Sequence, residues 1–166
     1  ISSNIISITS TLSPIFGIRV GQASGAAISG NTINATTSAG TAPVAISIET
    51  GVTNSSVTAN QITGCTVTHT NGYGGRGITV GTGAASSNIT IANNFIAGVN
   101  GSNFTGFGNS SSAGIMIGVL GNQNALTTTT GGVNIYHNSV NMAGSYSYAN
   151  ACLTAGLYIG SGASAL

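Results

Sequence analysis

Short runs in which apolar and polar residues alternate recur along the chain, separated by glycine, serine, threonine and asparagine. Alternation with a period of two is typical of half-buried β-strands, because successive side chains of a strand point to opposite faces. No apolar stripe with helical spacing persists anywhere in the sequence. The pattern therefore predicts an all-β protein built from many short strands.

One of these runs has an asparagine between two apolar ends. It reads "ISGNTI" at 28–33, "VTANQI" at 57–62, "IANNFI" at 91–96 and "IYHNSV" at 135–140, with a partial copy, "NII", at 4–6. A second run precedes each complete copy and reads "GIRV" at 17–20, "AISI" at 45–48, "GITV" at 77–80 and "GIMI" at 114–117, with a fifth, "GLYI", at 156–159. The two runs keep pace with each other while their spacing lengthens.

Two strand families that share one period predict a parallel β-solenoid, in which each repeat is one coil and neighbouring coils pair through the backbone. About five coils are expected over residues 1–166, as a single segment. The inward residues should form columns, and one such column is Ile18, Ile46, Ile78, Ile115 and Leu157. Because the chain begins and stops partway through a coil, we expect it to be a segment of a longer solenoid.

An asparagine occupies the same place in every copy of the first run: Asn4, Asn31, Asn60, Asn94 and Asn138. We expect each to form the bend between two strands, since asparagine tolerates the left-handed backbone conformation. Stacked coils would also place the amides above one another, so that they pair as a ladder. Asn93, in a slot filled elsewhere by other residues, is interpreted as variable decoration. Ligand binding by the amides is the alternative.

Charge is nearly absent, with 2 Lys+Arg, 1 Asp+Glu and a net charge of +1. Arg19 and Arg76 alone cannot neutralise nucleic-acid phosphates, so nucleic acid is excluded as a partner. The longest apolar-looking run, "AGIMIGVLG" at 113–121, is far shorter than the ~20 residues of a membrane-spanning helix. Low charge leaves little repulsion between copies, so the expected partners are other copies or flanking coils of the same protein.

Catalytic and metal-binding chemistry has few residues to use. Glu49 is the single acidic residue, interpreted as a lone exposed carboxylate, so the carboxylate pair of a glycosidase or a calcium site cannot form. His69 and His137 lie in different coils, and with Cys65 and Cys152 they match no metal-ligand spacing. The sequence predicts no enzyme, no cofactor and two free thiols, with Cys65 in the core.

Aromatic residues concentrate toward the end of the sequence. Tyr136, Tyr146, Tyr148 and Tyr158 are candidate surface contacts, because aromatic rings on an uncharged surface suit stacking on sugars or on protein. Packing of these residues against the coils is the other interpretation. Ice binding would require threonine at one outward position of every coil. The outward columns are mixed instead: Ser29, Thr58, Ala92 and Tyr136 in one strand, and Arg19, Ser47, Thr79, Met116 and Tyr158 in the other.

The segment "GVNIYHNSVNMAGSYSYANACLTAGLYIGSGASAL" at 132–166 resembles right-handed parallel β-helix repeats in large secreted bacterial surface proteins, and "SNITIANNFIAGV" at 87–99 does so more loosely. Proteins of this kind are often exported by type IX secretion and carry a separate C-terminal sorting domain. The resemblance implies a right-handed β-helix, an extracellular or cell-surface location, and a structural or adhesive role. It supplies no catalytic residues.

The leading functional hypothesis is a non-catalytic structural or adhesive segment that serves as a stalk or filament. A carbohydrate-binding module that uses the tyrosine-bearing loops is the alternative. Ice binding is a weaker alternative, as is a fragment of a polysaccharide-degrading enzyme whose carboxylates come from flanking coils or another chain.

Overall fold

The computed structural model describes residues 1–12, 15–69, 73–101, 112–121, 128–142 and 154–164. These residues form strands and turns, and the described part of the chain contains no helix. The prediction of an all-β protein is therefore confirmed. Because there is no helix, none of the described segments is a helix that could span a membrane.

The strands assemble into three sheets in which every pairing is parallel. Sheet 1 contains β1 (Ile5–Ser10), β4 (Thr32–Thr37), β7 (Gln61–Val67), β10 (Phe95–Ala97) and β14 (Ser139–Asn141), with β11 (Val99–Gly101) also paired to β7. Sheet 2 contains β2 (Phe16–Val20), β5 (Val44–Ile48), β8 (Arg76–Val80), β12 (Ser112–Ile117) and β15 (Thr154–Ile159). Sheet 3 contains β3 (Ala27–Ser29), β6 (Ser55–Thr58), β9 (Ile89–Ala92) and β13 (Val133–Tyr136).

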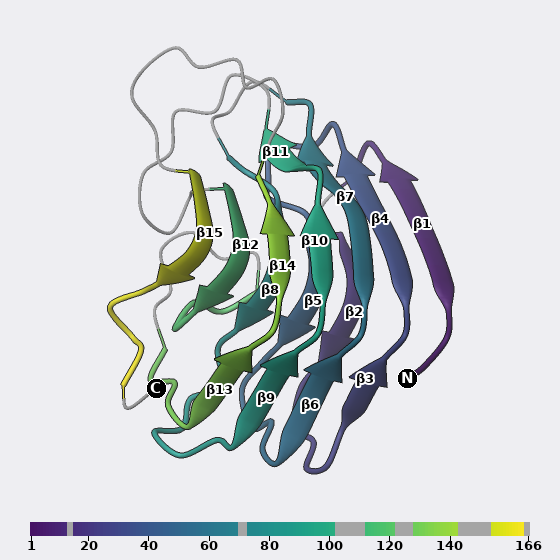
Figure 1. Cartoon of the computed structure of the whole chain (residues 1–166). Helices are drawn as coiled ribbons and strands as arrows, with labels where there is room; N and C mark the ends of the chain where they lie inside the picture. Colours follow the sequence, from purple (N-terminus) through teal and green to yellow (C-terminus); the bar gives the residue numbers. More distant parts are fainter. Residues whose placement is uncertain (13–14, 70–72, 102–111, 122–127, 143–153, 165–166) are drawn as a thin grey trace.

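The chain visits sheets 1, 2 and 3 in turn and then repeats the cycle. In Figure 1 the colours therefore progress across each sheet, from β1 at the purple end to β14 and β15 at the green and yellow end. We call one pass through the three sheets a unit. This arrangement is consistent with a β-solenoid-like parallel fold.

The register of the strands confirms the apolar columns. In sheet 2, Ile18, Ile46, Ile78, Ile115 and Leu157 pair in sequence from β2 to β15. In sheet 1 the inner column is Ile6, Ile33, Ile62, Ile96 and Val140. In sheet 3 it is Ile28, Val57, Ile91 and Ile135. These residues meet in one core between the sheets, and each fully buried isoleucine stabilises the fold by about 1.5–3 kcal/mol.

A column of small residues lies where sheet 2 packs against sheet 1. It consists of the first residue of each "GIxV"-type run: Gly17, Ala45, Gly77, Gly114 and Gly156. A Cβ on Gly17 would lie 2.7 Å from Cγ2 of Ile33, and one on Gly77 would lie 2.9 Å from Cγ2 of Ile96. The isoleucine column of sheet 1 therefore leaves room for little more than a hydrogen at these positions.

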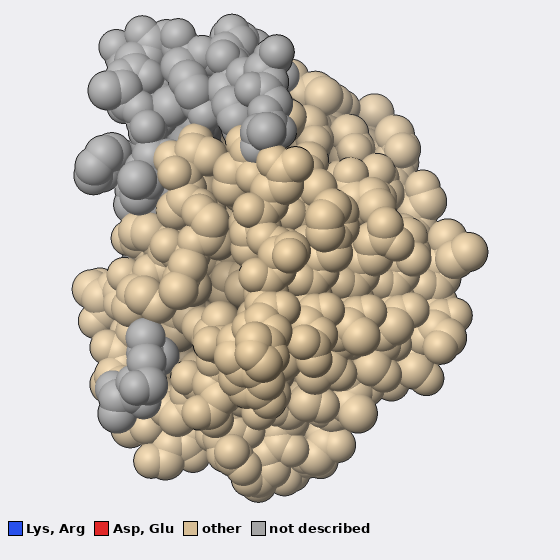
Figure 2. Space-filling model, viewed as in Figure 1, with Lys and Arg blue, Asp and Glu red and all other residues tan. Residues whose placement is uncertain are grey.

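The outer face of sheet 2 is covered rather than open. Thr79 and Met116, expected on an outward column, are fully buried. Val119, in the segment after β12, packs with Ala113 and Met116 in a second small apolar cluster. The insertion that follows β12 therefore packs onto the sheet instead of only looping away from it, and no Lys, Arg, Asp or Glu appears among the described residues on the face drawn in Figure 2.

Candidate functional site

The five asparagines of the repeat lie in one hydrogen-bonded row at the corner between sheets 3 and 1. The side-chain Nδ2 of each donates to the Oδ1 of the asparagine in the following unit. The four Nδ2–Oδ1 distances are 2.9 Å for Asn4 to Asn31, 2.8 Å for Asn31 to Asn60, 3.0 Å for Asn60 to Asn94 and 2.9 Å for Asn94 to Asn138. All four bonds point the same way along the row.

Each internal amide has all of its hydrogen-bonding groups satisfied. At Asn60, Oδ1 accepts from both the backbone N–H and the Nδ2 of Asn31. The second hydrogen on Nδ2 of Asn60 bonds the carbonyl of Ile28, in the sheet 3 strand of the preceding unit, at 3.0 Å. Asn31, Asn60 and Asn94 are each at most 1 % exposed. A buried amide with no unmet donor or acceptor ties two sheets and three units together.

The asparagines of the row do not adopt the left-handed conformation, so that part of the sequence prediction is wrong. None of the five has a positive φ. The left-handed residue is the one before each of them: Ser3 (φ 56°), Gly30 (63°), Ala59 (54°), Asn93 (56°) and His137 (55°). The row asparagine already belongs to the strand ladder, because its carbonyl accepts from the next unit, as in Thr32 N to Asn4 O at 2.9 Å. Extended backbone is needed for that bond, so the bend falls one residue earlier.

Asn93 is therefore part of the bend and not decoration. Its φ of 56° is one that asparagine adopts more readily than most residues. Asn94, beside it, supplies the amide of the row. The two asparagines have different tasks, one in the backbone and one in the side chain.

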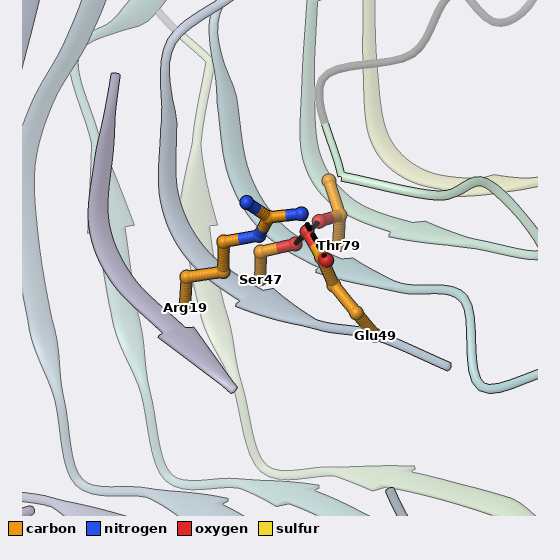
Figure 3. A network of polar contacts seen from close by, with 4 residues as sticks. All are labelled: Arg19, Ser47, Glu49 and Thr79. Carbon is orange, nitrogen blue, oxygen red and sulfur yellow. Dashed lines mark hydrogen bonds and ion pairs between the residues drawn. The ribbon is translucent and has the colours of Figure 1, made fainter. Parts of the chain in front are cut away.

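Glu49 belongs to a polar network on the outer face of sheet 2, which Figure 3 shows. Its Oε2 lies 2.7 Å from Nη2 of Arg19, and its Oε1 accepts from the hydroxyl of Ser47 at 3.0 Å. Thr79 in turn donates to Ser47 at 3.2 Å. The Glu49 side chain is 11 % exposed, which corrects the expectation of a lone exposed carboxylate. The hydrogen bond to Glu49 and its charge raise the pKa of Arg19.

Replacement of Arg19 by alanine is expected to lower the free energy of unfolding by about 1 kcal/mol or more, because it leaves a largely buried carboxylate without its counter-charge. Urea unfolding followed by far-UV circular dichroism measures the change. The matched variant E49Q keeps an acceptor for Ser47, so R19A in an E49Q background should cost less than R19A alone. Equal costs in the two backgrounds would show that the ion pair contributes nothing.

Cys65 is a buried free thiol, as the sequence predicted, whereas Cys152 lies outside the described residues. Its Sγ donates to the carbonyl of Arg76 at 2.9 Å, and burial raises the pKa of the Cys65 thiol to about 12. Arg76 is also fully buried, and its Nη1 donates to the carbonyl of Gly121 at 2.7 Å. Burial lowers the pKa of Arg76 to about 10.

Cys65 is expected to resist thiol reagents in the folded protein. The reactive thiolate is scarce at pH 8 when the pKa is raised to about 12, and the sulfur is covered. The variant C152S isolates this one thiol, and a chromogenic disulfide reagent counts it. We expect no reaction without denaturant and one thiol per chain in 6 M guanidinium, a concentration of about the strength that unfolds even hyperstable domains. Rapid labelling of the folded variant would contradict the buried position.

The candidate tyrosines do not form one cluster. Tyr136 is 48 % exposed, and its ring packs edge-on against His137 with centroids 5.4 Å apart. Tyr158 packs on the outer cluster of sheet 2, and Tyr146 and Tyr148 lie outside the described residues. A hollow of about 380 Å³ adjoins Tyr136 at the last strands of sheets 2 and 3. It is lined by Val133, Asn134, Ile135, Tyr136, Leu157 and Ile159.

A threonine column on the outer face of sheet 1 is missed by the sequence analysis. Thr9, Thr36 and Thr66 pair in register, and Asn100 follows them. A register shift between Ile33 and Asn34 hides this column, because the threonine lies five residues after Asn31 but six after Asn60. The neighbouring outer column is mixed: Ile5, Thr32, Gln61, Phe95 and Ser139.

Metal-ligating side chains are not brought together. Within the described ranges, no group of three His, Cys, Asp or Glu residues lies close enough to hold a metal ion. Compared with known proteins, the chain matches no family model, no curated protein and no solved structure.

Proposed function

We propose that the chain is a non-catalytic, load-bearing segment of an extracellular or cell-surface bacterial protein, acting as a stalk or filament. In this proposal the three sheets form a right-handed parallel β-helix of about five coils. The bacterial surface location and the handedness come from the resemblance of its repeats to those of secreted surface proteins.

The observation that carries the proposal is the uninterrupted asparagine row. Four consecutive amide-to-amide bonds of 2.8–3.0 Å link every unit to the next through the described core. Each unit contributes the same bond, so stability grows with the number of units and requires no ligand. This is how a repeat that transmits length or force is built, and it leaves no amide of the internal row available to a ligand.

The residues also argue against catalysis. The chain has 1 Asp+Glu residue, and this carboxylate, Glu49, is held by Arg19 and Ser47. General acid–base chemistry on polysaccharides uses two carboxyl groups, so a second would have to come from elsewhere.

Negative-stain electron microscopy of the native material tests the proposal. We expect elongated particles of uniform width, because parallel coils add about 4.8 Å of length each without adding width. Compact isolated particles in the native material would overturn it.

A carbohydrate-binding role is the second candidate, favoured by the exposed ring of Tyr136 beside the hollow at β13 and β15. Aromatic rings in an uncharged hollow suit stacking on a sugar face. A glycan array separates this candidate from the first, with Y136A as the variant and Y73F, a change outside the hollow, as the control. Binding that Y136A abolishes would favour the carbohydrate role.

A further inference from the structure

The asparagine row has two chemically different ends. Every bond in it runs from the earlier asparagine to the later one. Among the described residues, Oδ1 of Asn4 therefore has no donor from an earlier unit, and the backbone N–H of Asn138 has no later Oδ1 to bond. The equivalent internal N–H groups bond such an oxygen at 3.0–3.1 Å. One end of the row offers an acceptor and the other offers a donor.

The backbone edges beside these asparagines are complementary as well. In β1, the carbonyls of Asn4 and Ser10 accept from β4 and the residue that follows it, Ser38. Since backbone groups alternate sides along a strand, those of Ile5 and Ser7 face the open edge. In β14, Ser139 N donates to the carbonyl of Asn94, so the groups of Val140 face the opposite open edge.

The apolar columns end in the same complementary way. The inner column of sheet 1 runs from Ile6 to Val140, and both end residues are only half-buried, whereas Ile33, Ile62 and Ile96 between them are fully buried. In sheet 2 the terminal Leu157 and Ile159 are 48 % and 44 % exposed, while their internal counterparts have no exposure. A further parallel strand at either end would bury these side chains.

We propose that two copies of this chain join end to end, with β14 of one copy paired in parallel with β1 of a second. The asparagine row then continues from Asn138 to the partner's Asn4, and Val140 lies opposite the partner's Ile6. By the bonding rule of the internal strands, the N–H of the partner's Ser7 donates to the carbonyl of Val140. This inference rests on the proposed structural function and names the partner and the junction.

A second copy is the occupant that fits, because the junction requires the repeat's own register. The asparagine, the inner isoleucine and the edge donor must recur at fixed offsets, and β1 supplies all three in Asn4, Ile6 and Ser7. The contact uses different surfaces on the two copies, so it does not close and generates filaments. A net charge of +1 offers little electrostatic resistance to such growth.

The test uses the purified 166-residue chain, with association measured by sedimentation velocity and particle length by negative-stain microscopy. The wild-type chain is expected to associate with concentration into particles that lengthen at constant width. The variant S7P removes the edge N–H and breaks no hydrogen bond within the chain, so its self-association should be weakened at least about tenfold, from loss of one buried bond and its geometry. The control S7A keeps the N–H and should associate as the wild type does.

Mixing gives a sharper result. S7P blocks only the β1 end, so it can still add to wild-type ends through β14 and should shorten wild-type filaments at substoichiometric amounts. Should circular dichroism show S7P unfolded, N4A, which removes the terminal acceptor, replaces it in both assays. A wild-type chain that remains monomeric, or full association by the folded S7P and N4A variants, would overturn the junction. Elongated native material together with a monomeric purified chain would overturn the junction alone, whereas compact native material would overturn the proposed function.

Discussion

Replacement of Asn60 by alanine is expected to lower the free energy of unfolding by about 3–5 kcal/mol, since a buried donor or acceptor left unpaired costs about 1–3 kcal/mol. Asn60 lies in the middle of the row and is 1 % exposed. The substitution removes the shared acceptor of the Asn31 backbone and side chain, as well as the donor to Asn94 and to the carbonyl of Ile28. It also leaves a cavity in the corner between two sheets.

The matched control is the same substitution at the exposed end of the row. Asn4 donates to Asn31 and to the carbonyl of Ser2, but its neighbours reach water, so N4A should cost less than about 1 kcal/mol. Urea unfolding monitored by far-UV circular dichroism gives both values. If N60A and N4A cost the same, the row contributes no more in the core than it does at the surface.

The variant N60D separates lost donors from lost volume, because aspartate has nearly the shape of asparagine. Burial favours the neutral form and raises the pKa of the introduced carboxyl above its unfolded value of about 3.9. A raised folded-state pKa means that stability is fullest below the unfolded pKa and is lost as the pH rises through the folded pKa. N60D should therefore be more stable at pH 3 than at pH 7. The wild-type chain, with Glu49 as its only acidic side chain, supplies the baseline.

The sheets could be predicted from the sequence because two motifs recur in step. The asparagine run gave the strands of sheets 3 and 1, and the second run gave those of sheet 2, with the pairing of Ile46 to Ile78 following from their places in the runs. A period of two within each run fixed which side chains point inward. Local pattern and tertiary register agree here, since each column is built from equivalent residues.

The bend and the outer face could not be predicted in the same way. The choice between Asn93 and Asn94 as the left-handed residue depends on which of them has its carbonyl in the strand ladder, and the motif does not contain that information. The burial of Glu49 depends on a segment more than seventy residues later, since Gly121 packs against its carboxylate and Ser47. Contacts of this range leave no periodic trace in the sequence.

The glycines of the second run were visible in the sequence but carried no interpretation. Gly17, Gly77 and Gly114 begin three of its five copies, and the structure shows that they lie against the isoleucine column of sheet 1. A residue that is small because another sheet is near resembles, in the sequence, a residue that is small because a turn begins. Only the pairing of the sheets distinguishes the two cases.

Replacement of Gly77 by valine is expected to lower the free energy of unfolding by about 3 kcal/mol or more, through overpacking. The added Cβ would lie 2.9 Å from Cγ2 of Ile96 and would also meet the carbonyl oxygen of Gly114, which is backbone and cannot turn aside. Far-UV circular dichroism during urea unfolding measures the loss of stability. A tolerated valine would mean that sheets 1 and 2 lie farther apart than the packing of Ile96 indicates.

Gly156 provides the matched control, because it belongs to the same column at the last strand of sheet 2. There a Cβ would meet only the side chain of Val140, at 3.8 Å, which is an ordinary contact. G156V should therefore change the free energy of unfolding by no more than about 0.5 kcal/mol. Valine favours strands equally at both positions, so propensity cancels in the comparison. The difference between G77V and G156V then measures how closely sheets 1 and 2 approach within the core, and equal effects would contradict that close approach.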